Sequence, residues 1–251
     1  MSKAAKLCVQ SAQKNGVSGF VFNHSEYIID RYFKEFNVDI FKQKRGAGYW
    51  LWKPYLINKA LHFVKDADIL IYSDAGVEFI NSVHHIIEKM DEDIFFFGNN
   101  WNHVDWCKYP VAMDINYKWL YDAGGYSKAH GYSKLKQVQA SVIFFKVNDN
   151  TRKLVKEWLL WCQMPKFITD EYISLSEHMR DSTYIDDYPT FQEHRHDQAI
   201  LTCLQIKYGY KLHYWPATYN NGAFDYEKIA EYQNDNYPII FHHHRKRNNE
   251  W

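Results

Sequence analysis

The chain has 251 residues, of which 46% are hydrophobic and 24% charged, a balance that is typical of a globular protein and excludes a largely disordered one. Lysine plus arginine equal aspartate plus glutamate at 30 each, so the net charge gives no reason to expect a nucleic-acid partner. The sequence has no apolar run long enough to cross a membrane and no apolar signal-peptide core, so we expect no transmembrane segment.

In chain order, strand-like runs alternate with segments of helical periodicity. The expected strands are residues 19–24, 69–73, 94–98, 140–147, 211–215 and 237–243. The expected helices are residues 54–64, a segment after a cap at Asn81, residues 150–163 and residues 196–209. This alternation predicts a single α/β domain with helices on the faces of its sheet, and in such sheets ligands bind beyond the carboxyl ends of strands.

The four cysteines are far apart in the sequence and contain no C-x-x-C pair; they are Cys8, Cys107, Cys162 and Cys203. Such spacing predicts neither a disulfide framework nor a small zinc module. We therefore expect free thiols.

Two groups of aspartates flank the expected strand "ILIYS". Asp74 follows the strand directly, and the small residues Ala75 and Gly76 after it allow a ligand to approach the backbone closely. Asp66 and Asp68 precede the strand, which places them at the opposite edge of the sheet in a solvated loop. The strand direction therefore favours Asp74 as the functional acid, although turn aspartates are also common for structural reasons.

The segment "RGAGYWLWKP", residues 45–54, lacks the G-x-G-x-x-G pattern of a dinucleotide site. It places Arg45 and Lys53 around glycines and tryptophans just before a helix, where backbone N–H groups and cations form a cradle suited to a diphosphate. An aromatic packing cluster with incidental cations is the alternative interpretation.

Two further segments carry acid–base and metal-ligand chemistry. In "EHRHDQ", Asp197 opens a helix and could accept a proton from a hydroxyl nucleophile, although the helix dipole alone also favours an acid there. In "FHHHRKRN", residues 241–248, His242 and His244 are suited to metal binding and Arg245 to phosphate binding.

Taken together, "RGAGYWLWKPYLI", "DILIYSDAG", "EHRHDQAILT" and "IIFHHHRKRN" resemble GT-A-fold glycosyltransferases of a kind found in bacterial surface-polysaccharide clusters and large viruses. The resemblance extends from about Ser11 to Arg247. It implies a GT-A-like single domain over residues 1–251, with an open mixed central sheet flanked by helices. It also implies a nucleotide-diphosphate sugar donor, a glycan or glycoconjugate acceptor, and often Mn²⁺ or Mg²⁺ on the diphosphate. The expected location is the cytoplasm, that of the host for a viral protein, with peripheral membrane attachment left open.

The resemblance also implies a metal site. The first acid of the family's strand-end Asp-x-Asp pattern corresponds to Asp74, but the second corresponds to Gly76, which is a departure from the pattern. Hard divalent cations prefer several oxygen ligands, so either His242 or His244 and the donor phosphates complete the shell around Asp74, or catalysis needs little metal.

Further donor contacts follow from the same resemblance. In "VQASVIFFK", Gln139, Ala140 and Ser141 correspond to residues that lie against the donor sugar. Ser11 and Ala12 are similar to an early nucleotide-contact stretch.

The expected reaction transfers the sugar to an acceptor hydroxyl. A metal held by Asp74, together with Lys53 and Arg245, would stabilise the leaving diphosphate. Asp197 would act as general base in an inverting enzyme, or position hydroxyls in a retaining one. Residues 99–135, rich in Trp, Tyr, Gly and Asn, are a candidate acceptor-binding region.

Two other functions remain open. The first is a non-catalytic nucleotide- or sugar-binding module, because the missing second acid could mark lost catalysis. The second is a zinc-dependent hydrolase, without support from an H-E-x-x-H motif, that would use His194, His196, His242, His244 and Asp197.

Overall fold

The computed structural model describes residues 2–18, 29–108, 110–112, 114–116, 135–170, 190–219, 222–223 and 235–244. The strand expected at residues 19–24 lies outside these residues, and so does Arg245, the predicted phosphate ligand.

The described helices are α1 (Lys3–Lys14), α2 (Arg31–Phe36), α3 (Val38–Phe41), α4 (Gly46–Tyr49), α5 (Trp52–Ala60), α6 (His84–Ile87), the 3₁₀ turn η1 (His103–Trp106), α9 (Asp149–Cys162), α10 (Pro165–Ile168) and α11 (His196–Tyr208). The strands are β1 (Ile69–Ser73), β2 (Val77–Phe79), β3 (Ile94–Asn102), β4 (Lys136–Lys146), β5 (Leu212–His213), β6 (Ala217–Tyr219), β7 (Gly222–Ala223) and β8 (Phe241–His243). Among the described residues, helices α1 to α5 precede the first strand, helices and strands are mixed from β1 to α11, and strands β5 to β8 follow α11.

These strands form two four-stranded mixed sheets. In the first, with order β1-β4-β3-β5, the long strand β4 is antiparallel to both neighbours, and β5 is parallel to β3. In the second, with order β2-β8-β6-β7, β8 is antiparallel to β2 and parallel to β6. The expected mixed α/β architecture is confirmed, with a second small sheet that the sequence pattern did not predict.

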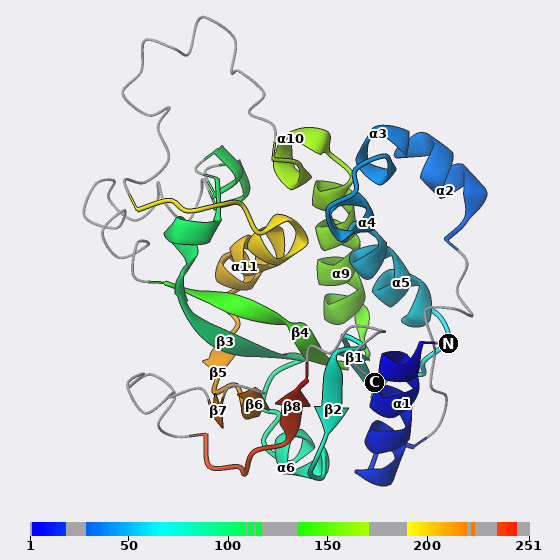
Figure 1. The fold of residues 1–251 in the computed structure, drawn as a ribbon, viewed down its shortest axis with the longest axis vertical. Helices are drawn as coiled ribbons and strands as arrows, with labels where there is room; N and C mark the ends of the chain where they lie inside the picture. Colours follow the sequence, from blue (N-terminus) through cyan, green and yellow to red (C-terminus); the bar gives the residue numbers. More distant parts are fainter. Residues whose placement is uncertain are drawn as a thin grey trace, which may run out of the picture.

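The first sheet separates two hydrophobic cores because alternate side chains of a strand point to opposite faces. Ile94 and Phe96 of β3 pack in the core that includes residues of α5, α9 and α11. Phe95 and Phe97 pack in the second core, with α1, α6 and the second sheet. Figure 1 shows the same arrangement, with α5, α9 and α11 on one side of the β3–β4 ribbon and α1, α6 and β8 on the other. Each fully buried phenylalanine contributes about 2–3 kcal/mol.

Local patterns predicted most long elements well. Helices α9 and α11 match the expected spans within a residue or two, and Gly209 ends α11 at φ 72°. Asn81 does not cap a helix: its side chain accepts from the Ser82 N–H instead, and α6 is a single turn. Strand β1 has the expected bounds but is an edge strand, half-buried and not fully buried.

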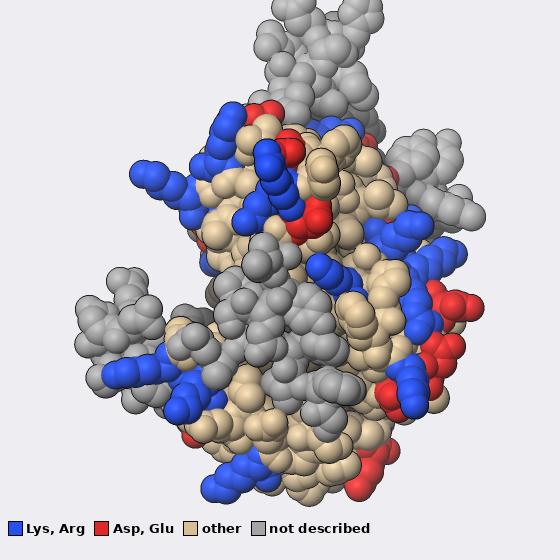
Figure 2. All heavy atoms as spheres, turned by 90° about the vertical axis from the view of Figure 1, so that its right-hand side faces the viewer, with Lys and Arg blue, Asp and Glu red and all other residues tan. Residues whose placement is uncertain are grey.

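The visible surface carries no dominant charge. On the face in Figure 2, which looks onto the right-hand side of Figure 1, lysine and arginine side chains are interspersed with aspartate and glutamate. This mixture agrees with the equal numbers of acidic and basic residues. Among the helices of the described residues, none has the length and apolar character needed to cross a bilayer.

Candidate functional site

Three predicted site residues from distant parts of the chain meet at one point. The Lys53 ammonium lies 3.2 Å from Asp197 Oδ2 and 3.7 Å from Asp74 Oδ1, and it donates a 3.2 Å hydrogen bond to the Ala140 carbonyl. We call Lys53, Asp74 and Asp197 the Lys53 cluster. Lys53 and Asp197 are buried, whereas the Asp74 side chain is 35% exposed, so a ligand in solution reaches the cluster first at Asp74.

The short element α4 and the residue after it form a left-handed turn, and this turn positions Lys53. All five residues from 46 to 50 have positive φ, with values from 50° to 95°. Glycines adopt such angles freely, but Ala47, Tyr49 and Trp50 each lose about 1–2 kcal/mol there.

Contacts within this turn offset part of that strain. The Trp52 indole N–H donates to the Gly46 carbonyl at 2.9 Å. A Cβ on Gly46 would lie 2.4 Å from the Trp50 ring, so this packing needs glycine. Helix α5 begins immediately after the turn and points its second residue, Lys53, into the core.

An irregularity in β4 supplies the backbone oxygens of the site. The β3–β4 register runs from Phe96 paired with Ile143 to Gly98 paired with Val138, so β4 uses more residues than β3 over this stretch. The Ala140 carbonyl within this stretch accepts from Lys53, and the neighbouring Ser141 carbonyl accepts from the Asp74 N–H at 2.8 Å.

Tyr72 orients the Asp74 carboxylate. Its hydroxyl donates to Asp74 Oδ1 at 2.5 Å. Burial and the Asp74 charge raise the pKa of Tyr72 well above its ordinary value, so the hydroxyl keeps the proton that it donates. Tyr72 and Asp74 are separated by one position and therefore share a face of an extended chain, so the alternation of "ILIYSD" contains a local signal for this contact.

Asp197 is fixed by its helix and by the residue before it. His196 has φ 47°, its ring centre lies 4.4 Å from that of Tyr49 in a tilted arrangement, and its Nδ1 lies 2.7 Å from the Ile168 carbonyl. The Trp158 indole donates to the Asp197 carbonyl at 2.9 Å. The left-handed turn therefore packs against the first turn of α11 and holds Lys53 and Asp197 side by side.

Burial and charge set the protonation of the cluster. Burial raises the pKa of Asp197 to about 6, although the positive charge of Lys53 opposes the rise. Burial alone would lower the pKa of Lys53, but Asp197 and Asp74 outweigh it and raise that pKa above the ordinary value. Lys53 is thus cationic at neutral pH. Asp197 is ionised at neutral pH and becomes protonated near pH 6.

Some predicted donor residues lie beside the cluster and others do not. The Gln139 amide donates to Ser141 Oγ at 3.0 Å, on the β4 stretch next to Asp74. The Ser11 hydroxyl accepts from the Phe79 N–H and donates to the Cys8 carbonyl, which joins α1 to β2. Ala12 is packed in the second core.

Arg45 lies at the surface near the start of α11. Its guanidinium donates to Glu193 at 2.9 Å and lies 3.5 Å from Asp170. Burial alone would lower the pKa of Arg45, but these two carboxylates outweigh it, so the pKa is raised and the charge is partly neutralised within the protein.

The predicted metal ligands are only partly brought together. The His244 N–H donates to the Gly76 carbonyl at 3.1 Å, which places its backbone beside the Asp74 turn, whereas His242 Nδ1 lies 2.9 Å from Thr218 Oγ1. Among the described residues, the one group of three ligand atoms close enough for a metal is His103, Cys107 and Cys203, which we call the Cys203 cluster.

The Asp74 region does not fit a Mn²⁺ or Mg²⁺ site built by the protein. It offers one carboxylate, whose Oδ1 already faces Lys53 and Tyr72, and Gly76 has no side-chain ligand. The metal requirement therefore stays a prediction.

The histidines of the hydrolase alternative serve packing. His194 lies 2.7 Å from the Phe167 carbonyl through Nε2, and its Nδ1 is 3.3 Å from the Lys108 N–H. Burial lowers its pKa well below the ordinary value, so it is neutral. Within the described part of the chain, neither His194 nor His196 belongs to a group of three ligands that could hold zinc.

An aromatic stack from the candidate acceptor region, residues 99–135, lies next to α11. Trp101 and Trp106 stack with ring centres 4.5 Å apart, and the Arg195 guanidinium lies 4.6 Å from the Trp106 ring. Most of the remaining candidate segment, residues 117–134, lies outside the described residues.

Comparisons with known proteins show a distant likeness to solved structures and none in sequence. No protein-family model matches the chain, and no curated protein matches it in sequence. Among solved structures, the apo form of mouse xyloside xylosyltransferase 1 is similar over 96% of this chain and 91% of that chain, with 11% identity and a TM-score of 0.43. Such a likeness concerns overall fold alone, and the function proposed below rests on the Lys53 cluster.

Proposed function

We propose that the protein transfers a sugar from a nucleotide-diphosphate sugar to an acceptor hydroxyl of a glycan or glycoconjugate. The observation that supports this most is the Lys53 cluster, in which two carboxylates and one cation come from three segments that resemble glycosyltransferase motifs. A structural ion pair would need one acid, whereas this cluster has a buried acid and a second acid open to solvent.

In this proposal Asp197 accepts the proton of the attacking hydroxyl. A general base works best when its pKa lies near the working pH, and burial raises the pKa of Asp197 to about 6. Lys53, 3.2 Å away, keeps the carboxylate ionised at neutral pH and fixes its direction. The base is thus both charged and weakly solvated, which increases its strength toward a nearby hydroxyl.

Asp74 binds hydroxyl groups of the donor. Its side chain is the exposed member of the cluster, and the Gln139–Ser141 pair on β4 lies beside it and adds polar groups. Arg45 and Arg245 are the cations we propose for the phosphates. Arg245 is outside the described residues, and Arg45 would exchange one of its carboxylate partners for phosphate.

A donor panel tests this proposal. Thermal unfolding is measured with UDP- and GDP-sugars, with and without Mn²⁺, and turnover is followed by release of nucleoside diphosphate. At a hundredfold excess of a donor over its Kd, stabilisation of about 2.7 kcal/mol is expected. Asp74→Asn should remove it, while Asp66→Asn, which replaces an exposed acid paired with Arg152, should not.

The outcomes separate the candidate functions. Donor binding with turnover that depends on Asp74 supports transfer. Donor binding without turnover in the presence of candidate acceptors would indicate a binding module, which the glycine at position 76 makes the second candidate. No stabilisation by any donor, or equal stabilisation of the Asp74→Asn variant, would contradict the proposal.

A further inference from the structure

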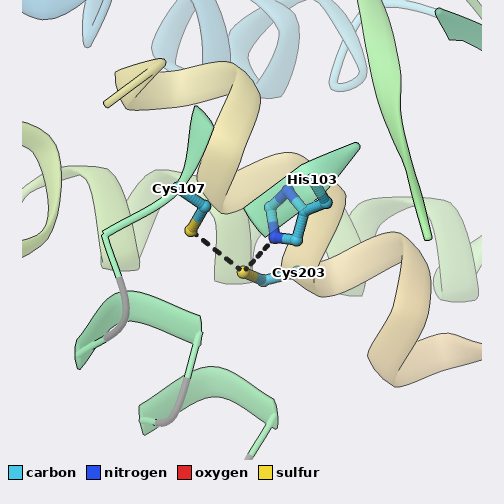
Figure 3. Close-up of side chains that lie close together, drawn as sticks. All are labelled: His103, Cys107 and Cys203. Atoms are coloured by element: carbon cyan, nitrogen blue, oxygen red, sulfur yellow. Dashed lines mark hydrogen bonds between the residues drawn. The ribbon is translucent and has the colours of Figure 1, made fainter. Parts of the chain in front are cut away.

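A second buried cluster lies on α11, away from the predicted site. Cys203, in the middle of α11, has its Sγ 3.3 Å from His103 Nε2 and 4.0 Å from Cys107 Sγ. All three ligand atoms lie within 4.8 Å of one another, and the three residues are between 0% and 1% exposed. Figure 3 shows the two thiols and the imidazole converging on one point from η1, the residue after it, and α11.

We infer that His103, Cys107 and Cys203 bind a zinc ion. Zn–S bonds of about 2.3 Å and Zn–N bonds of about 2.0 Å in tetrahedral geometry separate two sulfurs by roughly 3.8 Å and a sulfur from a nitrogen by roughly 3.5 Å. Two of the three distances between ligand atoms, 4.0 Å and 3.3 Å, are close to these values, and the third, between His103 and Cys107, is within 4.8 Å. Thiolate and imidazole ligands favour zinc over the harder Mg²⁺ or Mn²⁺.

The zinc complex of these three ligands would have no net charge, which is favourable at a buried position. Each thiol releases its proton to solvent when it binds the ion, so two thiolates, one neutral imidazole and Zn²⁺ have no net charge. A neutral complex avoids the large penalty for an unpaired charge in a protein interior. The three side chains occupy three of the four usual zinc positions, and the fourth is left to a ligand that they do not supply.

The ion would connect η1 to α11, the helix that carries Asp197 of the Lys53 cluster. Residues 103–107 follow β3, and the Trp106 carbonyl next to Cys107 accepts from the Arg195 N–H at 3.0 Å. Arg195 directly precedes α11, whose first turn carries Asp197. Zinc between η1 and Cys203 would therefore brace the helix on which Asp197 lies. The inference does not depend on the proposed transferase function, because it concerns metal content and stability.

Metal analysis of the full-length protein tests the inference. Protein purified without chelator, or refolded with added Zn²⁺, is measured for zinc by inductively coupled plasma mass spectrometry. About one zinc per chain is expected, and Cys203→Ser should lose most of it. Cys162→Ser and Cys8→Ser are the matched controls, because both residues are buried free cysteines outside the cluster, and they should keep zinc.

Measurements on the unmodified chain keep the test independent of variant folding. Exchange of zinc for Co²⁺ should give the charge-transfer absorption of a cobalt thiolate, and a chelator should lower the Tm. Zinc below a tenth of an equivalent after refolding with Zn²⁺, or equal zinc in Cys203→Ser and Cys162→Ser, would overturn the inference. A Cys107–Cys203 disulfide in the purified protein, seen by mass spectrometry after digestion, would overturn it as well.

Discussion

Two polar clusters lie along helix α11, and they differ in solvent exposure. The Lys53 cluster at its first turn contains charged oxygen and nitrogen groups, and its Asp74 side chain is 35% exposed. The Cys203 cluster, six residues further along, or about 9 Å at the rise of an α-helix, is fully buried and contains sulfur and imidazole groups. Both join segments from distant parts of the sequence. One has an open side suited to a substrate that comes and goes, whereas the other suits an ion that stays.

Replacing the proposed base should give the largest effect and tests whether the first cluster is catalytic. Asp197→Asn should lower kcat by about 10²–10⁴-fold with donor KM nearly unchanged, because the amide cannot accept the proton. In the unmodified enzyme kcat/KM should fall about tenfold per pH unit below about 6, since protonation inactivates a carboxylate of this pKa. The variant's residual activity should lack this decline.

A matched acid separates the catalytic effect from a change of charge. Asp39→Asn alters an exposed acid on α3 and should leave kcat and its pH dependence unchanged. A raised donor KM with little loss of kcat in Asp197→Asn would instead assign Asp197 to positioning of sugar hydroxyls.

Replacing Lys53 tests whether the Lys53 cluster also stabilises the folded protein. Lys53→Met should lower the free energy of unfolding by about 3–5 kcal/mol at neutral pH, because it leaves buried Asp197 without its partner. Combining it with Asp197→Asn should recover part of this loss, since no charge is then left buried. Urea unfolding measures both. Lys156→Met on the exposed face of α9 is the control, and additive losses in the double variant would contradict the pairing.

A smaller, pH-dependent effect on stability is expected from His196, which packs against Tyr49 beside the Lys53 cluster. Burial lowers its pKa to about 4, so below about pH 6.5 the unfolded chain takes up a proton before the native protein does. Stability should therefore fall by about 2–3 kcal/mol as the pH drops from 6.5 toward 4. His196→Asn, which tolerates the positive φ, should lessen this fall. Asp170, Arg45 and Glu193 also face the ring, so the measured quantity is the difference between the two Tm-versus-pH curves.

The smallest effect is expected at the acid pair that precedes β1. Asp66 forms an exposed ion pair with Arg152 at 2.6 Å, and Ala67 makes a tight turn at φ 70°. Asp66→Ala should cost less than about 1 kcal/mol and leave turnover unchanged. Lost turnover in this variant would mean that the predicted division between Asp66 and Asp74 is wrong.

The sequence predicted the long elements because their burial patterns are local. Helix α9 buries Leu154, Val155 and Trp158 at helical spacing, as expected. The second sheet was not predicted as a separate layer because β6, β7 and β8 have two or three residues each, too few to show a period.

Three of the predicted site residues, Lys53, Asp74 and Asp197, lie together in the structure, but their arrangement differs from the expected one. We expected Asp74 at the carboxyl ends of strands in an α/β sheet, whereas β1 is antiparallel to β4 and its end meets the middle of that strand. The register shift that exposes the Ala140 carbonyl is a property of strand pairing and has no local signal.

The Cys203 cluster, in contrast, could not be predicted from the sequence. The spacing of the cysteines argued against a zinc module, because Cys107 and Cys203 are far apart in the chain. Only the packing of η1 on α11 brings them together, and the His103–Cys107 spacing was the one short-range signal available.

The left-handed turn at residues 46–50 also bears on the order in which the chain folds. A mirror-image turn with three L-residues is unfavourable by itself, so it cannot form early from local preference. The Tyr49 ring packs against His196, and this stabilising contact requires α11 to be docked on the sheet. We therefore expect the sheet and its large helices to form first and the Lys53 cluster to assemble last, so that a late intermediate would have a native core but no functional site.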